Sequence, residues 1–362
     1  MPRAGRATAA CQRSDWFMKK RLMVLLASAV VLASLAGCGS NNAAEASGAS
    51  SEAEEAAETA GPALESEDAA AGTEEAEKPG EKKTELVIAG GDAAGVAAAI
   101  RAVSEGMDPS AILIVEAGDE LAADAAEKGS FFNEADSDIQ FEAEIADSYE
   151  EFLGDTRKAG GDKNDTAMME YLVESASEAR VWLESLGVKF GAPEQREGSS
   201  AARSLPGAEE ALGLQVEKAL KAKAAELQIP VRYNTAVVKL VYDADKAVSG
   251  IVLSEDGKEE NVDCLAVVAT DPALLPLFEE LKTVNGADED AAAVVVTACA
   301  EAIRAGSGEE EETVPGLYAA GRIIEAAVHG AGALEGNEMV SMAVYGMTAG
   351  TEAAIYIGDT RG

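Results

Sequence analysis

The sequence has 362 residues, with 66 Asp and Glu side chains against 29 Lys and Arg, and a formal net charge of −37. Nucleic acid and anionic lipid headgroups repel so acidic a chain, so we predict no nucleic-acid partner and no electrostatic adhesion to a membrane. His329 is the single histidine, which excludes the Cys and His spacings of zinc sites, and we predict no metal.

The first residues have the order of an export signal. Basic residues at 19–21 precede an apolar run at 22–35, which is shorter than the roughly 20 residues that span a bilayer. Residues 35–38, Leu-Ala-Gly-Cys, resemble the box in which bacterial lipoproteins are cleaved and lipidated on the cysteine. We therefore predict a lipid on Cys38 that tethers the protein to the cell membrane, outside the cytoplasm. A plain signal peptide with an incidental cysteine is the alternative.

Composition divides the chain into three segments. Residues 1–38 form an N-terminal extension and the lipoprotein signal peptide, with Met18 as the interpreted start. Residues 39–83 are Ala, Glu, Ser and Gly with almost no large apolar side chain, so they are predicted to be an acidic disordered linker. Residues 84–358 are enough for one domain with a full core.

Two cysteines lie within this predicted domain. Cys264 and Cys299 each occur in an apolar run. Buried free thiols are the favoured interpretation, and a disulfide between them is the alternative.

The domain begins with a strand–turn–helix–strand pattern. An apolar strand at 85–89 is followed by Gly-Gly-Asp-Ala-Ala-Gly at 90–95, a helix of small residues at 96–105, and a buried strand at 111–115 that ends on Glu116. In dinucleotide-binding folds such a turn aims a helix N-terminus at a pyrophosphate, and the acid binds a ribose hydroxyl. An ordinary unit of this shape without a nucleotide is the alternative.

Asp92 departs from this motif. It occupies the second glycine position, where backbone approaches the pyrophosphate. A carboxylate about 4 Å from a phosphate charge costs about 1 kcal/mol in water and about 4 kcal/mol at an effective dielectric near 20. The larger figure would weaken binding nearly a thousandfold, at about 1.4 kcal/mol per decade. Asp92 is therefore the strongest single argument against a bound dinucleotide, and a side chain turned out to solvent is the alternative.

The rest of the chain alternates helical and strand patterns. A helix is predicted through residues 170–185, and another at 214–227 has apolar residues on one face. Strands are predicted at 231–241, 248–253 and 262–269. The final helix, 339–354, has small residues at close-packing positions.

Four stretches of the chain carry a family resemblance. Residues 159–165 and 182–190 are similar to Gly-Gly…Asn-Asp-Pro and Trp-Leu…Leu-Gly-Val segments of the soluble fumarate reductases. Residues 314–321 look like the family's closing strand, and 328–337 resemble its His-Gly-Ala segment, where a helix approaches the flavin ring. The chain thus resembles the FAD-binding domain of the fumarate reductase and succinate dehydrogenase flavoproteins. This implies an α/β fold, a doubly wound Rossmann-like FAD-binding sheet with an inserted β-ribbon, and FAD as the cofactor.

The resemblance also implies which residues hold FAD. They comprise the glycine turn and the ribose acid, one residue of the ribbon, two residues that end a returning strand, and the closing glycine with the start of the final helix. They are Gly90, Gly91, Ala94, Gly95, Glu116, Val238, Ala269, Thr270, Gly321, Gly336, Asn337 and Met339. No catalytic residue is assigned.

Several departures from the family fall on its chemistry. Arg322 stands where the family has a glutamate, and Ala333 stands where it has the arginine that grips a substrate carboxylate. The family's glycine-rich loop after the ribose acid is replaced by residues 122–126, Ala-Ala-Asp-Ala-Ala. The interval between Ala269 and Val314 is too short for the family's capping domain, which carries a proton-donating arginine.

The remaining ionisable residues of this region do not define a mechanism. A structural role is the favoured interpretation of His329, because no nucleophile is placed beside it. Four acids of the same region are interpreted as solvated side chains: Asp271, Glu325, Glu335 and Glu338.

We therefore expect a membrane-tethered, FAD-binding, oxidoreductase-like protein of the fumarate reductase flavoprotein lineage without fumarate reductase turnover. The alternative is a degenerate, non-catalytic surface lipoprotein that keeps the fold as a binding or scaffold module. The lost glycine and arginine favour the alternative, and the intact strand–turn–helix unit with Glu116 favours the first. The sequence names no substrate, electron donor or electron-transfer partner.

Overall fold

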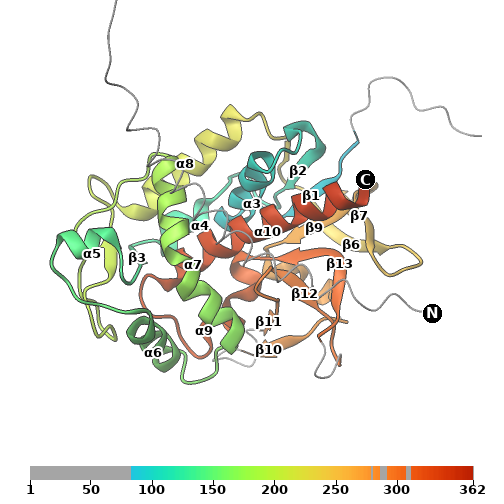
Figure 1. Ribbon diagram of the computed structural model, residues 1–362. Coiled ribbons are helices and arrows are strands. Elements are labelled where there is room, and N and C mark those ends of the chain that lie inside the picture. Colours follow the sequence, from blue (N-terminus) through green and yellow to red (C-terminus); the bar gives the residue numbers. More distant parts are fainter. Residues whose placement is uncertain (1–82, 279, 286–291, 307–310, 362) are drawn as a thin grey trace, which may run out of the picture. The chain divides into compact units, whose positions relative to one another are not determined.

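The structure is a computed structural model that describes residues 83–361 apart from 279, 286–291 and 307–310 (Figure 1). The signal peptide, Cys38 and nearly all of the predicted linker lie outside the described residues. None of the helices in the described part combines the length and the apolar character that crossing a bilayer requires.

A six-stranded sheet forms the centre of the domain. Its strands are parallel except β12, which runs antiparallel to β13. Every residue of β1, β2 and β9 is buried, as expected for apolar runs in a parallel sheet covered on both faces. The spatial order is β12 (Glu301–Ile303), β13 (Thr313–Ala319), β9 (Ala266–Ala269), β1 (Leu86–Ala89), β2 (Ile112–Val115) and β5 (Val231–Arg232). The predicted α/β class with a Rossmann-like sheet is confirmed.

Two long helices pack closely beside this sheet. They are α3 (Ala93–Ser104) and α10 (Asn337–Arg361), which lie side by side in Figure 1. Small residues allow the approach: a Cβ atom at Gly346 of α10 would lie 2.6 Å from the carbonyl oxygen of Ala94. The small residues predicted for the final helix therefore bring it against the helix that follows the glycine turn.

The inserted ribbon is a separate antiparallel sheet of β6 (Ala236–Tyr242), β7 (Val248–Glu255) and β8 (Lys258–Asp263). The structure divides two of the predicted strands. The strand predicted at 231–241 is interrupted at 233–235, where Asn234 has φ 51°, so β5 stays in the central sheet and β6 leaves it. The strand predicted at 262–269 is likewise broken after Asp263, between β8 and β9.

The remaining elements surround the sheet. In the helix predicted at 214–227, Val216, Leu220 and Ala224 are buried, but Leu214 is exposed. The other helices are α4 (Ala123–Lys128), α5 (Asp138–Glu142), α6 (Tyr149–Ala159), α7 (Thr166–Ser185), α8 (Leu212–Glu226) and α9 (Glu325–His329), and the 3-10 turns are η1 (Pro109–Ala111), η2 (Pro272–Leu277) and η3 (Gly321–Ile324). The short strands are β3 (Phe131–Asn133), β4 (Ser204–Pro206), β10 (Thr283–Asn285) and β11 (Ala292–Val294).

The interval between β9 and β13 is short. Its described residues form η2, the antiparallel pair β10–β11 and the edge strand β12. They contain no capping domain, which agrees with the prediction from sequence length.

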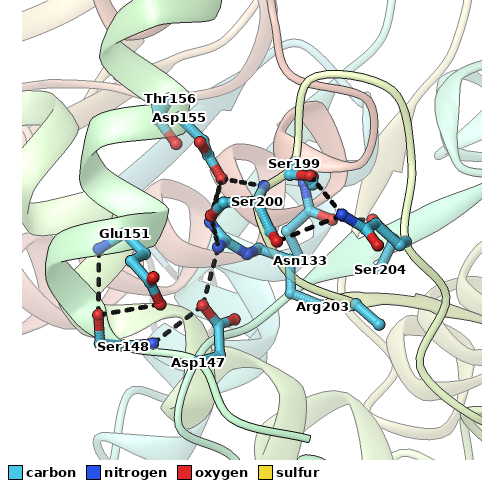
Figure 2. A network of polar contacts seen from close by, with 12 residues as sticks. Asn133, Asp147, Ser148, Glu151, Asp155, Thr156, Ser199, Ser200, Arg203 and Ser204 are labelled. Carbon is cyan, nitrogen blue, oxygen red and sulfur yellow. Dashed lines mark hydrogen bonds and ion pairs between the residues drawn. The ribbon is translucent and has the colours of Figure 1, made fainter.

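A buried arginine secures the segment before β4 to α6. The side chain of Arg203 is fully buried between two carboxylates, with Nη2 2.8 Å from Asp147 Oδ1 and Nη1 3.1 Å from Asp155 Oδ2 (Figure 2). The guanidinium also lies over the ring of Phe152, 4.9 Å from its centroid. Charges removed from water in this way are tolerated only when paired, so the network fixes the segment firmly.

The two cysteines of the domain are free thiols. Cys264 is buried and Cys299 is partly buried. Burial raises the pKa of Cys264 to about 12, so this thiol stays protonated and unreactive at neutral pH.

Candidate cofactor site

The glycine turn and the ribose acid form one end of the site. Gly90, which follows β1, has φ 120°, a conformation that favours glycine. Glu116 follows β2, and its carboxylate accepts hydrogen bonds from the backbone N–H groups of Gly91 at 2.7 Å and Gly118 at 2.6 Å. Main-chain bonds therefore hold the carboxylate beside the turn, at the position where dinucleotide folds bind a ribose hydroxyl.

Asp92 points into the protein and not to solvent. It is the N-cap of α3, and its Oδ1 accepts the N–H of Gly95 at 2.9 Å. Only 7 % of the residue is exposed. A Cβ atom at Gly321 would lie 2.9 Å from Asp92 Oδ2, so the closing glycine packs directly against the carboxylate. The side chain thus occupies the helix N-terminus, where a pyrophosphate would bind.

The charge on Asp92 is poorly compensated. No hydrogen bond of good geometry reaches Oδ2 among the described residues, and Arg322 Nε lies 3.8 Å away. Arg322 is shared with Asp271, whose Oδ1 is 3.6 Å from Nη2. Burial first, and the charge of Asp124 second, raise the pKa of Asp92 to about 7, against the lowering effects of the capped N–H, the Thr270 hydroxyl and Arg322.

Asp124 provides a second carboxylate at the same helix end. It lies in the first turn of α4, and its Oδ1 accepts the N–H of Ala93 at 2.8 Å. The residue before α4, Ala122, is left-handed with φ 52°, and its N–H donates to the carbonyl oxygen of Gly91 at 2.7 Å. Two carboxylates therefore take N–H groups from the first turn of α3.

Most of the predicted site residues meet at one edge of the sheet. The ends of β1, β9 and β13 are in register, with Ala89 beside Ala269 and Ala269 beside Ala319. The residues that this brings to the turn are Gly90, Gly91, Ala94, Gly95, Glu116, Ala269, Thr270 and Gly321. Val238 is not among them: its side chain is exposed on β6, whereas the neighbouring Val237 packs against the core.

The start of α10 is held by a buried amide network. Asn133 Nδ2 donates to Asn337 Oδ1 at 2.7 Å and to the carbonyl oxygen of Glu335 at 2.8 Å. Asn337 Nδ2 donates to the hydroxyl of Thr156 at 3.0 Å, and Ser204 donates to Asn133 Oδ1 at 2.7 Å. The predicted site residues Gly336 and Asn337 thus lie at a rigid helix start whose amide groups bind protein.

The ionisable residues near this helix have structural contacts. His329 is 5 % exposed at the end of α9. Asp271 caps η2 by accepting the N–H of Ala273 at 3.0 Å. Glu335 binds Arg196, with 3.0 Å between Oε2 and Nε. Asp271 and Glu335 remain partly solvated, in line with the interpretation from sequence, and each also makes a contact within the protein.

One small cavity lies between these elements. A cavity of about 10 Å³ holds roughly one water molecule. Its lining comes from α4, η3, α9 and the first two turns of α10 and includes Asp124, Arg322, Glu325, Glu338, Met339 and Ser341. Met339, predicted to contact FAD, is 1 % exposed here. The Glu116 end of the site therefore has the features of a ribose-binding position, whereas Asp92 and Asp124 lie at the helix N-terminus at which dinucleotide folds bind a pyrophosphate.

The described residues also contain no group of three or more His, Cys, Asp or Glu side chains that is placed to hold a metal ion. Asp92 and Asp124 accept N–H groups at the start of α3, and Asp92 also pairs with Arg322.

The family model for the FAD binding domain matches residues 85–275, and the chain belongs to this family. The family match supports FAD as the cofactor of the fold. Among curated relatives, an NADH:fumarate oxidoreductase of Klebsiella pneumoniae (strain 342) is 31% identical over 215 residues, which cover 59% of this chain and 23% of that protein. A fumarate reductase (cytochrome) of Shewanella frigidimarina is 26% identical over 170 residues, which cover 47% of this chain and 29% of that protein. The matched part is therefore about a quarter of each relative.

Solved structures agree on the fold. The open conformation of a flavocytochrome c3 fumarate reductase superposes with a TM-score of 0.67 at 15% identity and covers 76% of this chain and 79% of that chain. A 3-ketosteroid-delta4-(5alpha)-dehydrogenase from Rhodococcus jostii RHA1 gives 0.61 at 17% identity, with coverage of 76% and 97%. The family match and the curated relatives confirm the predicted resemblance to the FAD-binding domain of the fumarate reductase flavoproteins.

Two contributors to the site were missed in the sequence. The role of Asp124 depends on α4, which begins at a left-handed alanine without a side-chain cap and so has no start signal. Asn133 lies far in sequence from the α10 residues that it binds. For Asp92 the sequence showed an acid at the second glycine position, but its role as the N-cap of α3 was not predicted, although Asp is a preferred N-cap residue.

Proposed function

We propose that this protein is a membrane-tethered, FAD-binding member of the fumarate reductase flavoprotein lineage that does not itself reduce fumarate. The observation that carries FAD binding is the Glu116 carboxylate, held by two backbone N–H groups beside the glycine turn. The family match over residues 85–275 supports it. When bound, FAD would supply the redox chemistry, and the chain would supply position and electrostatics.

The lack of turnover follows from what the chain brings to the site. No capping domain is present in the described interval between β9 and β13, and Ala333 replaces the substrate arginine that the family resemblance implies. Arg322 lies between Asp92 and Asp271, so its charge is already directed to carboxylates of the chain. Positions 322 and 333 therefore offer a fumarate dianion no arginine beyond Arg322, which already pairs with carboxylates of the chain.

The purified protein tests this directly. Supplied with FAD, fumarate and a reduced dye, it should show turnover well below the roughly 1 s⁻¹ at the low end of typical enzymes. Turnover at or above that rate would show that another group replaces the arginine and would overturn this part of the proposal.

Anchoring is proposed from the Leu-Ala-Gly-Cys box at 35–38, which lies outside the described residues. A lipid on Cys38 would hold the acidic domain outside the cytoplasm at the end of its linker, and at least two acyl chains anchor stably. Cys38→Ala should abolish incorporation of labelled fatty acid and leave the uncleaved precursor. Unchanged labelling would contradict the anchor.

A non-catalytic scaffold is the second candidate. The observation that favours it is the pair of carboxylates, Asp92 and Asp124, at the N-terminus of α3, together with the small size of the cavity that Asp124 lines. It predicts that neither the wild type nor Asp92→Gly binds FAD at any pH. FAD binding by either protein would exclude it.

A further inference from the structure

Two carboxylates already accept N–H groups of the first turn of α3. Asp92 takes the N–H of Gly95, and Asp124 takes the N–H of Ala93. In a dinucleotide fold the pyrophosphate binds at this helix end. Because Gly321 packs against Asp92 Oδ2, the carboxylate has little room to turn aside. An ionised Asp92 and a pyrophosphate therefore compete for one position.

We propose that FAD binding at this turn is coupled to the uptake of one proton by Asp92, so that the cofactor loads in mildly acidic solution and is released in alkaline solution. The inference rests on the proposed function, because it assumes that the turn binds FAD. A protonated Asp92 has no charge to repel a phosphate, and its hydroxyl is able to donate to a phosphate oxygen. The proton comes from solvent, and no covalent bond changes.

The charges around Asp92 favour this uptake. Asp124 from α4 adds a negative charge at the same helix end, and Arg322 from η3 is half exposed and divided between two acids. The pyrophosphate would add further negative charge. The charged groups on the elements packed around the turn are Asp124, Glu116, Asp271, Arg322, Glu325 and Glu338.

The direction of the pH effect follows from these surroundings. Burial and Asp124 raise the pKa of Asp92 to about 7 before FAD binds. Below this pH Asp92 is already protonated, and the affinity for FAD should be flat. Above it a proton must be taken up on binding, and Kd should rise by about tenfold per pH unit.

The experiment is a titration of the full chain, solubilised in detergent, with FAD from pH 5.5 to 8.5, followed by flavin fluorescence quenching. Calorimetry in two buffers of different ionisation enthalpy counts the protons. We expect uptake of about one proton at pH 8 and close to none at pH 5.5. An equal Kd at both ends of the range in the wild type would overturn the coupling and leave FAD binding intact.

Two variants assign the proton to its residue. Asp92→Asn keeps an oxygen that accepts the N–H of Gly95, and it should bind FAD with no pH dependence above pH 7. Asp124→Asn removes one cause of the raised pKa of Asp92. The break, which is the pH above which Kd for FAD begins to rise, should therefore move to lower pH in this variant. Asp108→Asn is the matched control, because Asp108 caps η1 at the opposite end of the sheet strands; it should keep the break of the wild type.

The remaining outcomes also decide the matter. If Asp92→Asn retains the slope of the wild type, another group takes up the proton and the proposal is wrong. If neither wild type nor Asp92→Asn binds FAD at any pH, the proposed function fails and the coupling fails with it. Thermal unfolding of each variant without FAD confirms that it is folded. If Asp92→Asn is not folded, Asp124→Asn provides the test: a break at lower pH supports the proposal, and a break at the pH of the wild type overturns it.

Discussion

Arg322 Nε lies 3.8 Å from Asp92 Oδ2, across the end of the central sheet from the N-terminus of α3. Both residues depart from the family pattern, in which the resemblance places a glycine and a glutamate. Far apart in sequence, they are neighbours in the fold, and their charges are opposite. The acid that replaces a glycine of the turn is therefore accompanied by a cation that replaces a glutamate after the closing glycine, and this distant cation compensates the buried charge only in part.

Asp92 should destabilise the folded protein at alkaline pH. Its pKa is raised in the folded state, so its favourable contribution is complete below its ordinary pKa and is lost as pH rises towards 7. Asp92→Asn should then raise the free energy of unfolding at pH 8 by on the order of 1–4 kcal/mol relative to the wild type. Thermal melts at pH 8 and pH 4 measure the effect. An equal difference at both pH values would contradict this role.

Removing the charge of Arg322 should lower the free energy of unfolding, whereas removing the charge of Asp92 should raise it. Arg322→Gln leaves Asp92 with less compensation, so the pKa of the acid should rise further and the pH break in FAD binding should move upward. The loss of stability should be no more than about 1 kcal/mol, because the pair is long and Arg322 is half exposed. A break that stays in place would show that Arg322 acts only on Asp271.

Glu116 should contribute to FAD affinity by binding the ribose. Glu116→Ala removes two charge-assisted hydrogen bonds to the turn, each worth about 1.5–3 kcal/mol, as well as the partner for a ribose hydroxyl. We expect FAD affinity at pH 6 to fall at least tenfold. Glu116→Gln, which keeps one acceptor, should be intermediate. Undiminished affinity in the alanine variant would place the ribose elsewhere.

The buried network in Figure 2 should dominate the stability of the segment before β4. Arg203→Met leaves Asp147 and Asp155 without their shared cation, and we expect a loss of about 3–5 kcal/mol in chemical denaturation. Lys189→Ala, which breaks the exposed pair with Glu209, is the control and should cost at most about 1 kcal/mol. Similar losses in both variants would show that burial of Arg203 adds nothing.

Much of the domain follows from sequence patterns. The strands β1 and β2 are short apolar runs, the turn is rich in glycine, and Glu116 ends a strand, so each local signal agrees with the fold. The close packing of α10 was also visible as a pattern of small residues. The return of β9 and β13 to the central sheet was predicted from the family resemblance, because periodicity alone does not show which strands are neighbours.

Other features depend on contacts that no local pattern records. The break at Asn234 moves β6 out of the central sheet, although residues 231–241 read as one apolar strand. The inward orientation of Asp92 depends on Gly321 and Arg322, which are distant in sequence. Whether an acid in a glycine turn points to solvent or to the helix is decided by such neighbours, and only the structure brings them together.

The most direct test of the account is an FAD titration of the wild type and Asp92→Gly at pH 8, where the carboxylate is ionised. Asp92→Gly removes both the charge and the side chain from the helix end. One pH unit above the pKa of Asp92, it should tighten FAD binding by about tenfold through the charge, and by more where the side-chain bulk also opposes the phosphate. Equal affinity in the two proteins would mean that the pyrophosphate does not meet Asp92. No binding in either would contradict the claim that this turn is an FAD site.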